Sequence, residues 1–471
     1  IQRAAADFCL RIARFAPAEM LYRRIVQKEI PASDAEVAAA RRGLAMALVG
    51  QQDYRKSTEA LKLVGLSLDD KGLLVDNKLS ESDDEQLLQA KVLGSLNHHK
   101  QRGVAITALE GLKQKNLLPI EDRFFLARLL VQQDSDPANW PKARALLKLL
   151  TLEQPKNPRY LSYAAKQHVQ HKEFSEAEQL IARLQTVEQE RKVVAGGFGS
   201  VELRAKLLET RGQGSQAAQL LSKYAAEPEA SPLRKLLVAQ LEARLGNFSA
   251  AIDRCEEVRA IDAHRIDADS AAVAIIHTNK PSEAQPTRFT QWQKERSRVE
   301  TTLRSALAKE PKDVALRLQL AELMEFQGKY DEVEKLCRSV LQDQDTNLVA
   351  LNNLAWLLAH RADRAAEALT LINRAIDKFG PLPELLDTRA VALTNRGDFA
   401  GAMRDLERVV NQAPTAARLF HLSRAHERAR NTTAAVAALR QANDMGLTPQ
   451  MLHPAEQAEY QRVTADLIKR Q

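Results

Sequence analysis

The sequence predicts an all-α fold, a right-handed α-solenoid of about twelve helix-turn-helix repeats that ends in a capping helix. Three observations predict this class. Aromatic residues make up only 5% of the chain and Gly only 18 of its 471 residues, a composition that favours helices over sheets. A chain of this length exceeds what one hydrophobic core usually serves. Small and apolar residues also recur at a fixed interval, as at Ala355 and Ala390, which lie 35 positions apart.

The clearest repeats lie within residues 314–446. Each has two segments with apolar residues at helical spacing, joined by a short turn. In two of the turns a Gly stands two positions before an aromatic residue, as in Gly397-Asp398-Phe399, where we expect the ring to pack back on the pair. Small residues stand where the two helices of a pair should cross closely. These residues are Ala321, Ala355, Ala390 and Ser423.

This pattern resembles the tetratricopeptide repeat, which has about 34 residues, small side chains at the helix crossings and a Pro near its end. Leu351, Leu386 and Leu419 stand where the family usually has Trp. The resemblance implies stacked helix pairs in which the first helix of each pair lines a concave, protein-binding face. The general sequence pattern of the repeats within residues 348–446, rather than their residue identities, most resembles that of large bacterial repeat proteins.

Regularity varies along the chain and predicts four parts. Residues 1–265 should hold degenerate repeats, 266–312 an irregular repeat with a Pro-containing loop, 313–447 regular repeats, and 448–471 the capping helix. The loop at Pro281–Pro286 and the longer link at 187–200 are either insertions at a solenoid edge or contact loops or hinges. The chain begins at Ile1 with a helical pattern, so we expect the N-terminus to be truncated.

No motif in the sequence indicates catalysis. The Gly-rich segment at 196–200 lacks the Lys-Ser/Thr of a phosphate-binding loop, and the adjacent His98 and His99 point in different directions on a helix. The three cysteines are far apart, so they form neither a disulfide framework nor a zinc site. We therefore expect a non-enzyme without cofactor or metal.

The net charge of +7 is spread along the chain, without a basic stripe of the kind that binds nucleic acid. We therefore expect no nucleic-acid partner. The sequence has no apolar run long enough to span a membrane. These observations leave the compartment, cytoplasm or periplasm, and the oligomeric state open.

By the family resemblance, a partner binds to polar side chains on the first helices that are not needed for packing. Arg and Asn suit this role because they hydrogen-bond carboxylates or peptide backbone. The candidates are Arg42, Lys166, Lys206, Arg244, Asn352, Trp356, His360, Asp387, Asn395, His421, Arg424 and Arg428. Among them, Asn352, Trp356 and Arg424 belong to the most regular repeats, so we expect a partner to dock across these three.

The sequence therefore predicts a non-catalytic scaffold that presents a concave groove to a protein or peptide partner. An alternative is that it forms the accessory repeat region of a larger bacterial enzyme, or of an exopolysaccharide-export or secretion protein.

Overall fold

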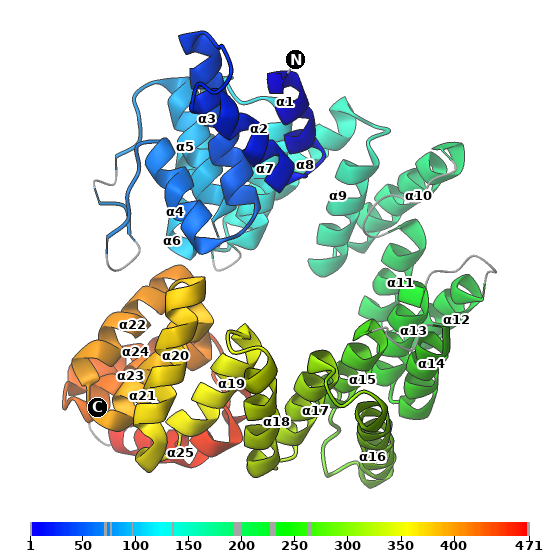
Figure 1. Ribbon diagram of the computed structural model, residues 1–471. Coiled ribbons are helices and arrows are strands. Elements are labelled where there is room, and N and C mark those ends of the chain that lie inside the picture. The colour runs from blue at the N-terminus through cyan, green and yellow to red at the C-terminus, as the bar shows by residue number, and fades with distance from the viewer. Residues whose placement is uncertain are drawn as a thin grey trace. The chain divides into compact units, whose positions relative to one another are not determined.

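The computed structural model of the chain describes residues 2–69, 73–75, 78–96, 98–133, 136–191, 199–226, 232–261 and 266–468. These residues form 25 α-helices and two short 3-10 helices, and their one β-type contact is an isolated bridge between Leu68 and Leu74. Successive helices pack in pairs (Figure 1). The predicted all-α repeat fold is confirmed. None of the described helices is both long and apolar enough to cross a membrane.

The chain forms two compact units, one made of residues 1–140 and 346–471 and the other of residues 141–345. The N-terminal helices of the first unit are α1 (Gln2–Arg11), α2 (Phe15–Val26), α3 (Asp34–Gly50), α4 (Tyr54–Leu63), α5 (Asp83–Ser95), α6 (His99–Gln114) and α7 (Ile120–Gln132). Its C-terminal helices are α19 (Leu348–Ala359), α20 (Ala365–Phe379), α21 (Pro383–Arg396), α22 (Phe399–Gln412), α23 (Ala416–Arg428), α24 (Thr432–Asp444) and α25 (Pro454–Ile468). The 3-10 helices η1 (Ala362–Arg364) and η2 (Pro449–Met451) precede α20 and α25.

The second unit begins within α8 (Asn139–Glu153). Its other helices are α9 (Pro158–Gln170), α10 (Phe174–Arg191), α11 (Ser200–Thr210), α12 (Gly214–Ala225), α13 (Pro232–Leu245), α14 (Phe248–Ile261), α15 (Ile266–Thr278), α16 (Pro286–Lys309), α17 (Val314–Phe326) and α18 (Tyr330–Asp343). Most of the Gly-rich segment at 196–200 lies outside the described residues.

Local sequence signals fix the ends of the regular helices. The side chains of Asp313 and Asn347 cap α17 and α19 by accepting hydrogen bonds from backbone N–H groups three positions later. Gly397 ends α21 with φ of 93°, a left-handed conformation that residues with a Cβ rarely adopt. The pair formed by α21 and α22 therefore turns back on itself at Gly397, where the sequence predicts a turn.

The small residues at the predicted crossings are buried. Ala355 and Ala390 have no exposed surface, and Ala321 is 1% exposed. Ser423 replaces Ala at the crossing of α23 and α24, where its hydroxyl donates a hydrogen bond of 2.8 Å to the carbonyl of Ala435. A buried hydroxyl is tolerated at this crossing because its hydrogen bond is satisfied within the pair.

Replacing Ala355 or Ala390 by Leu should overpack a crossing and lower the free energy of unfolding by about 1–3 kcal/mol. The damage should stay within the altered pair and its neighbours, because repeats contact mainly adjacent repeats. Hydrogen exchange resolved along the chain measures this, with the exposed Ala366→Leu on α20 as the control. Uniform loss of protection over all repeats would contradict the expectation.

The irregular repeat departs from the others in helix length. α16 has 24 residues and begins at Pro286, directly after the Pro-containing segment that the sequence singles out. Trp292 of α16 is 1% exposed and donates a hydrogen bond of 2.9 Å from Nε1 to the carbonyl of Ile276 on α15. The long helix is therefore fastened to α15 by a buried aromatic anchor.

Candidate protein-binding site

Eight of the twelve predicted site residues lie on or at the ends of three first helices, α19, α21 and α23. These are Asn352, Trp356, His360, Asp387, Asn395, His421, Arg424 and Arg428. We call this set the α19–α23 face. Asn352 joins it through Thr388 of α21, whose hydroxyl donates to Asn352 Oδ1 at 2.8 Å.

The structure does not bring the other four candidates to this face. Arg42 is an exposed residue of α3 and Lys166 an exposed residue of α9. Lys206 of α11 and Arg244 of α13 both pair with Glu209, and the distance from Lys206 Nζ to Glu209 Oε2 is 2.9 Å. Arg42 thus belongs to the N-terminal helices of the first unit, and the other three residues belong to the second unit.

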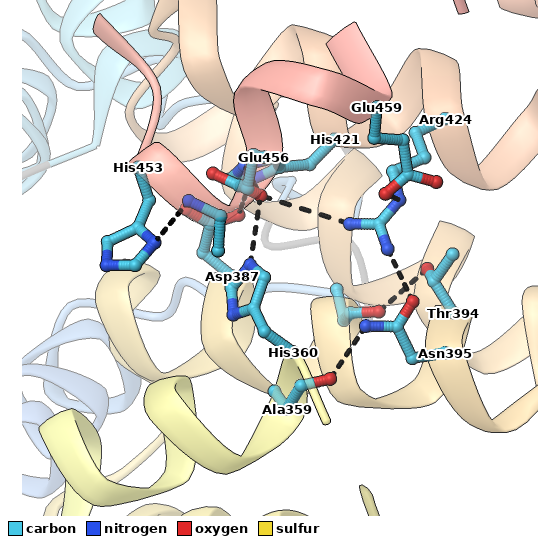
Figure 2. Close-up of polar contacts among 12 residues, drawn as sticks. Ala359, His360, Asp387, Thr394, Asn395, His421, Arg424, His453, Glu456 and Glu459 are labelled. Atoms are coloured by element: carbon cyan, nitrogen blue, oxygen red, sulfur yellow. Dashed lines mark hydrogen bonds and ion pairs between the residues drawn. The ribbon is translucent and has the colours of Figure 1, made fainter. Parts of the chain in front are cut away.

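The C-terminal helix α25 covers the α19–α23 face (Figure 2). Its Glu456 side chain is 2% exposed and reaches both ends of the face. Glu456 Oε1 lies 3.1 Å from His421 Nε2 on α23 and 3.4 Å from His360 Nε2 at the end of α19. The same oxygen lies 3.9 Å from Nη1 of Arg424.

Arg424 is the second anchor point of α25. Its side chain is 3% exposed, and its Nε lies 2.8 Å from Glu459 Oε2. Arg424 also donates from Nη2 to Asn395 Oδ1, and Asn395 Nδ2 donates to the carbonyl of Ala359 at 2.7 Å. Arg428, which is more exposed, pairs with Glu459 at 3.2 Å. The guanidinium of Arg424 is therefore held in place from both α21 and α25.

His421 is buried between two carboxylates. Its Nδ1 lies 2.7 Å from Asp387 Oδ1, and its Nε2 faces Glu456. Burial disfavours the imidazolium, but the charges of Asp387 and Glu456 and the hydrogen bonds to them outweigh burial and raise the pKa of His421 to about 10. Burial also disfavours the Glu456 carboxylate, but His421 and His360 hold the pKa of Glu456 well below its usual range.

Trp356 supplies the aromatic part of the face. Its ring centroid lies 4.8 Å from that of His360, 5.7 Å from that of His421 and 6.3 Å from that of His453, which precedes α25. His360 Nδ1 donates to the Trp356 carbonyl at 2.9 Å. Three imidazoles therefore surround one indole, and one of them belongs to the covering segment.

The residues that cover the face, namely His453, Glu456 and Glu459, are not among those predicted from the sequence. The available signal was the spacing of the two carboxylates, which places them one turn apart on the same side of a helix. The same helix also packs on the last repeat. Val463 is fully buried, and Tyr460 is partly buried, against a cluster that includes Phe420.

This arrangement binds a helix through buried ion pairs. Within the part of the chain that the structure describes, no group of three or more His, Cys, Asp or Glu residues is arranged to hold a metal ion. His421 and Arg424 on α23 and His360 at the end of α19 meet carboxylates on α25, and hydrogen bonds from α21 orient His421 and Arg424.

No protein-family profile matches the chain, and no curated protein does so either. Solved structures with similar helix arrangements include yeast Tom70, at 14% identity and a TM-score of 0.37, covering 99% of this chain and 89% of that one. The APC/C hetero-tetramer Cut9–Hcn1 gives 14% identity and a TM-score of 0.35, covering 94% of this chain and 79% of that one.

A thermophilic TPR protein of Thermus thermophilus gives 15% identity and a TM-score of 0.31, covering 40% of this chain and 100% of that one. At these values the likeness supports no conclusion about binding partners. The chain's own helix pairs, with buried small residues at their crossings, give it an all-α helix-pair repeat architecture.

Proposed function

We propose that the chain is a non-catalytic scaffold that holds a protein or peptide partner on the α19–α23 face. The observation that carries the proposal is that polar side chains from three successive first helices converge on one surface, and that this surface already holds a helix. Arg424 and Trp356 are the residue types that most often dominate binding energy at protein interfaces.

The partner is expected to dock across Asn352, Trp356 and Arg424. Asn352 and Trp356 are partly exposed, whereas Arg424 lies beneath α25. A partner that reaches Arg424 must therefore take the place of Glu459, while Trp356 offers a flat surface beside it. Polar contacts of this kind orient a ligand, and the indole supplies apolar area.

Replacing Trp356 or Arg424 by Ala should reduce recovery of the partner by about thirty-fold, since loss of an interface anchor costs about 2 kcal/mol or more. The measurement is affinity isolation with the wild-type chain, followed by quantification of each bound protein with the two variants. Far-UV circular dichroism checks that the repeats remain folded.

The matched control is Arg440→Ala, which removes an exposed Arg from the second helix α24. This variant should retain the partner at the wild-type level. Equal recovery of every bound protein by all four chains would place the binding site elsewhere, with the segment at Pro281–Pro286 as the next region to alter.

A further inference from the structure

The position of α25 differs from that of a helix that only covers the end of the last repeat. A simple end cap would contact only α23 and α24, the helices of the final pair. Instead, Glu456 contacts His360 at the end of α19, two pairs earlier, and His453 lies with its ring centroid 5.5 Å from that of His360. The segment that begins at His453 therefore extends from α19 to α23, across the α19–α23 face (Figure 2).

The charges on the two sides of this contact are complementary. The face contributes His421 and Arg424 as buried cations, with Arg428 at its edge. The covering helix contributes Glu456 and Glu459, three positions apart and so on one side of a helix. Without these carboxylates, His421 would keep Asp387 but lose Glu456, and Arg424 would lose its contact with Glu459, a state that costs free energy. The face therefore favours a ligand that brings two carboxylates one turn apart.

The apolar contacts of α25 that the structure describes are centred on Val463 and Tyr460. Among the residues of α25 whose side chains the structure describes, Val463 is the one fully buried apolar residue. The side chain of Ala455 is exposed. A ligand that brings its own carboxylates can compete with Glu456 and Glu459 for the same side chains, His421 and Arg424.

We propose that the partner of the α19–α23 face is a protein segment that forms a helix with two carboxylates one turn apart, and that α25 occupies its place in the free chain. The inference rests on the proposed function and adds the chemistry of the partner. In the free chain, His453 lies three positions before Glu456 and its ring contacts Trp356. A partner segment should therefore carry a flat side chain three positions before its first carboxylate. Because α25 is covalently linked to α24, its effective concentration at the face is high. A partner must bind tightly enough, at its own concentration, to compete with it.

The test uses the chain's own acidic helix as a probe supplied in trans. The probe is a fluorescein-labelled peptide with the sequence of residues 448–468. The receptor is the full chain carrying Glu456→Gln and Glu459→Gln, which keeps the shape of α25 but removes its carboxylates. Fluorescence anisotropy should show that the peptide binds this variant at least about ten-fold more tightly than it binds the wild-type chain.

Three controls identify the contact. A peptide with Gln at both Glu positions should not bind, and adding Arg424→Met to the receptor should abolish binding, whereas adding Arg440→Met should not. Raising the salt from about 50 mM to about 500 mM should weaken binding. Circular dichroism of each receptor checks that the loss is not caused by unfolding.

Weak and equal binding of the peptide to both chains would overturn the inference and identify α25 as a fixed structural helix. In that case, the dependence of partner recovery on Trp356 would still decide the scaffold function separately. Exchange of α25 between wild-type chains, seen as a dimer in sedimentation and lost in the double Gln variant, would also overturn it. The occupant would then be a second copy of this chain.

Discussion

Replacing Glu456 by Ala should lower the free energy of opening of α25 by about 3 kcal/mol, the low end of the cost of removing one partner from a buried ion pair. The change leaves His421 Nε2 without its carboxylate and takes from His360 the carboxylate it faces. The low end applies because His421 keeps Asp387 and Arg424 keeps Glu459. Native-state hydrogen exchange should show α25 opening about a hundred-fold more often.

The control is Glu427→Ala, which removes another ion pair between α23 and α25. Glu427 pairs with Arg462 at 3.0 Å, but the two side chains are 20% and 42% exposed. An exposed pair of this kind contributes about 0–1 kcal/mol. If both variants opened α25 equally, the buried network around Glu456 would not be what holds the helix.

The attachment of α25 should also weaken as the pH rises from about 6.5 to about 10. The pKa of His421 is raised in the folded chain, so its contribution is fully present below its ordinary pKa of 6.5 and is lost as the pH rises through the folded value of about 10. The loss should be at most about 1.4 kcal/mol per pH unit, the value for one titrating group. The charged groups that face His421 are Asp387 on α21 and Glu456 on α25.

At acid pH the attachment of α25 depends on pH in the opposite direction. The pKa of Glu456 is lowered in the folded chain, so its contribution is present above its ordinary value of 4.5 and is lost as the pH falls below that value. The attachment should therefore be strongest between about pH 4.5 and about pH 6.5. A partner that competes with α25 through the same carboxylates should follow the same pH dependence.

Fluorine NMR of fluorotryptophan-labelled protein measures this attachment, because the Trp356 ring contacts His453 of the covering segment. The resonance of Trp356, assigned by substitution, should shift from a covered to an uncovered position as the pH rises. His421→Gln should remove the slope above pH 6.5, while His453→Gln should leave it in place. If the slope above pH 6.5 remained in His421→Gln, the titration that causes it would belong to another group.

The repeat fold could be predicted from the sequence because each helix pair is stabilised mainly by its neighbours. The burial of Ala355 and Ala390 can be predicted from their spacing alone, because a crossing that recurs every 35 positions requires a small residue each time. The turn at Gly397 is equally local, because it depends on one backbone conformation. In such a chain, the local sequence pattern is therefore enough to predict the repeat fold.

The α19–α23 face was also accessible from the sequence, at the level of which residues share it. Trp356, His421 and Arg424 occupy positions of the first helices that the packing of a pair does not use, and the helical period places such positions on one side. The same reasoning also selected Lys206 and Arg244, which the structure places in the second unit, paired with Glu209. Position on a first helix does not by itself bring residues of distant repeats together.

The sequence by itself determined the helix pairs, their crossings and the polar residues of the first helices. Only the tertiary structure decided that α25 lies across those residues. His360 and Glu456 are 96 positions apart, and nothing in the repeat pattern links them. Carboxylates such as Glu456 are usually exposed, so a pattern of apolar residues assigns them to solvent. Their burial depends on side chains that the fold assembles from α19 and α23, and pairing at this sequence distance is a property of the folded chain.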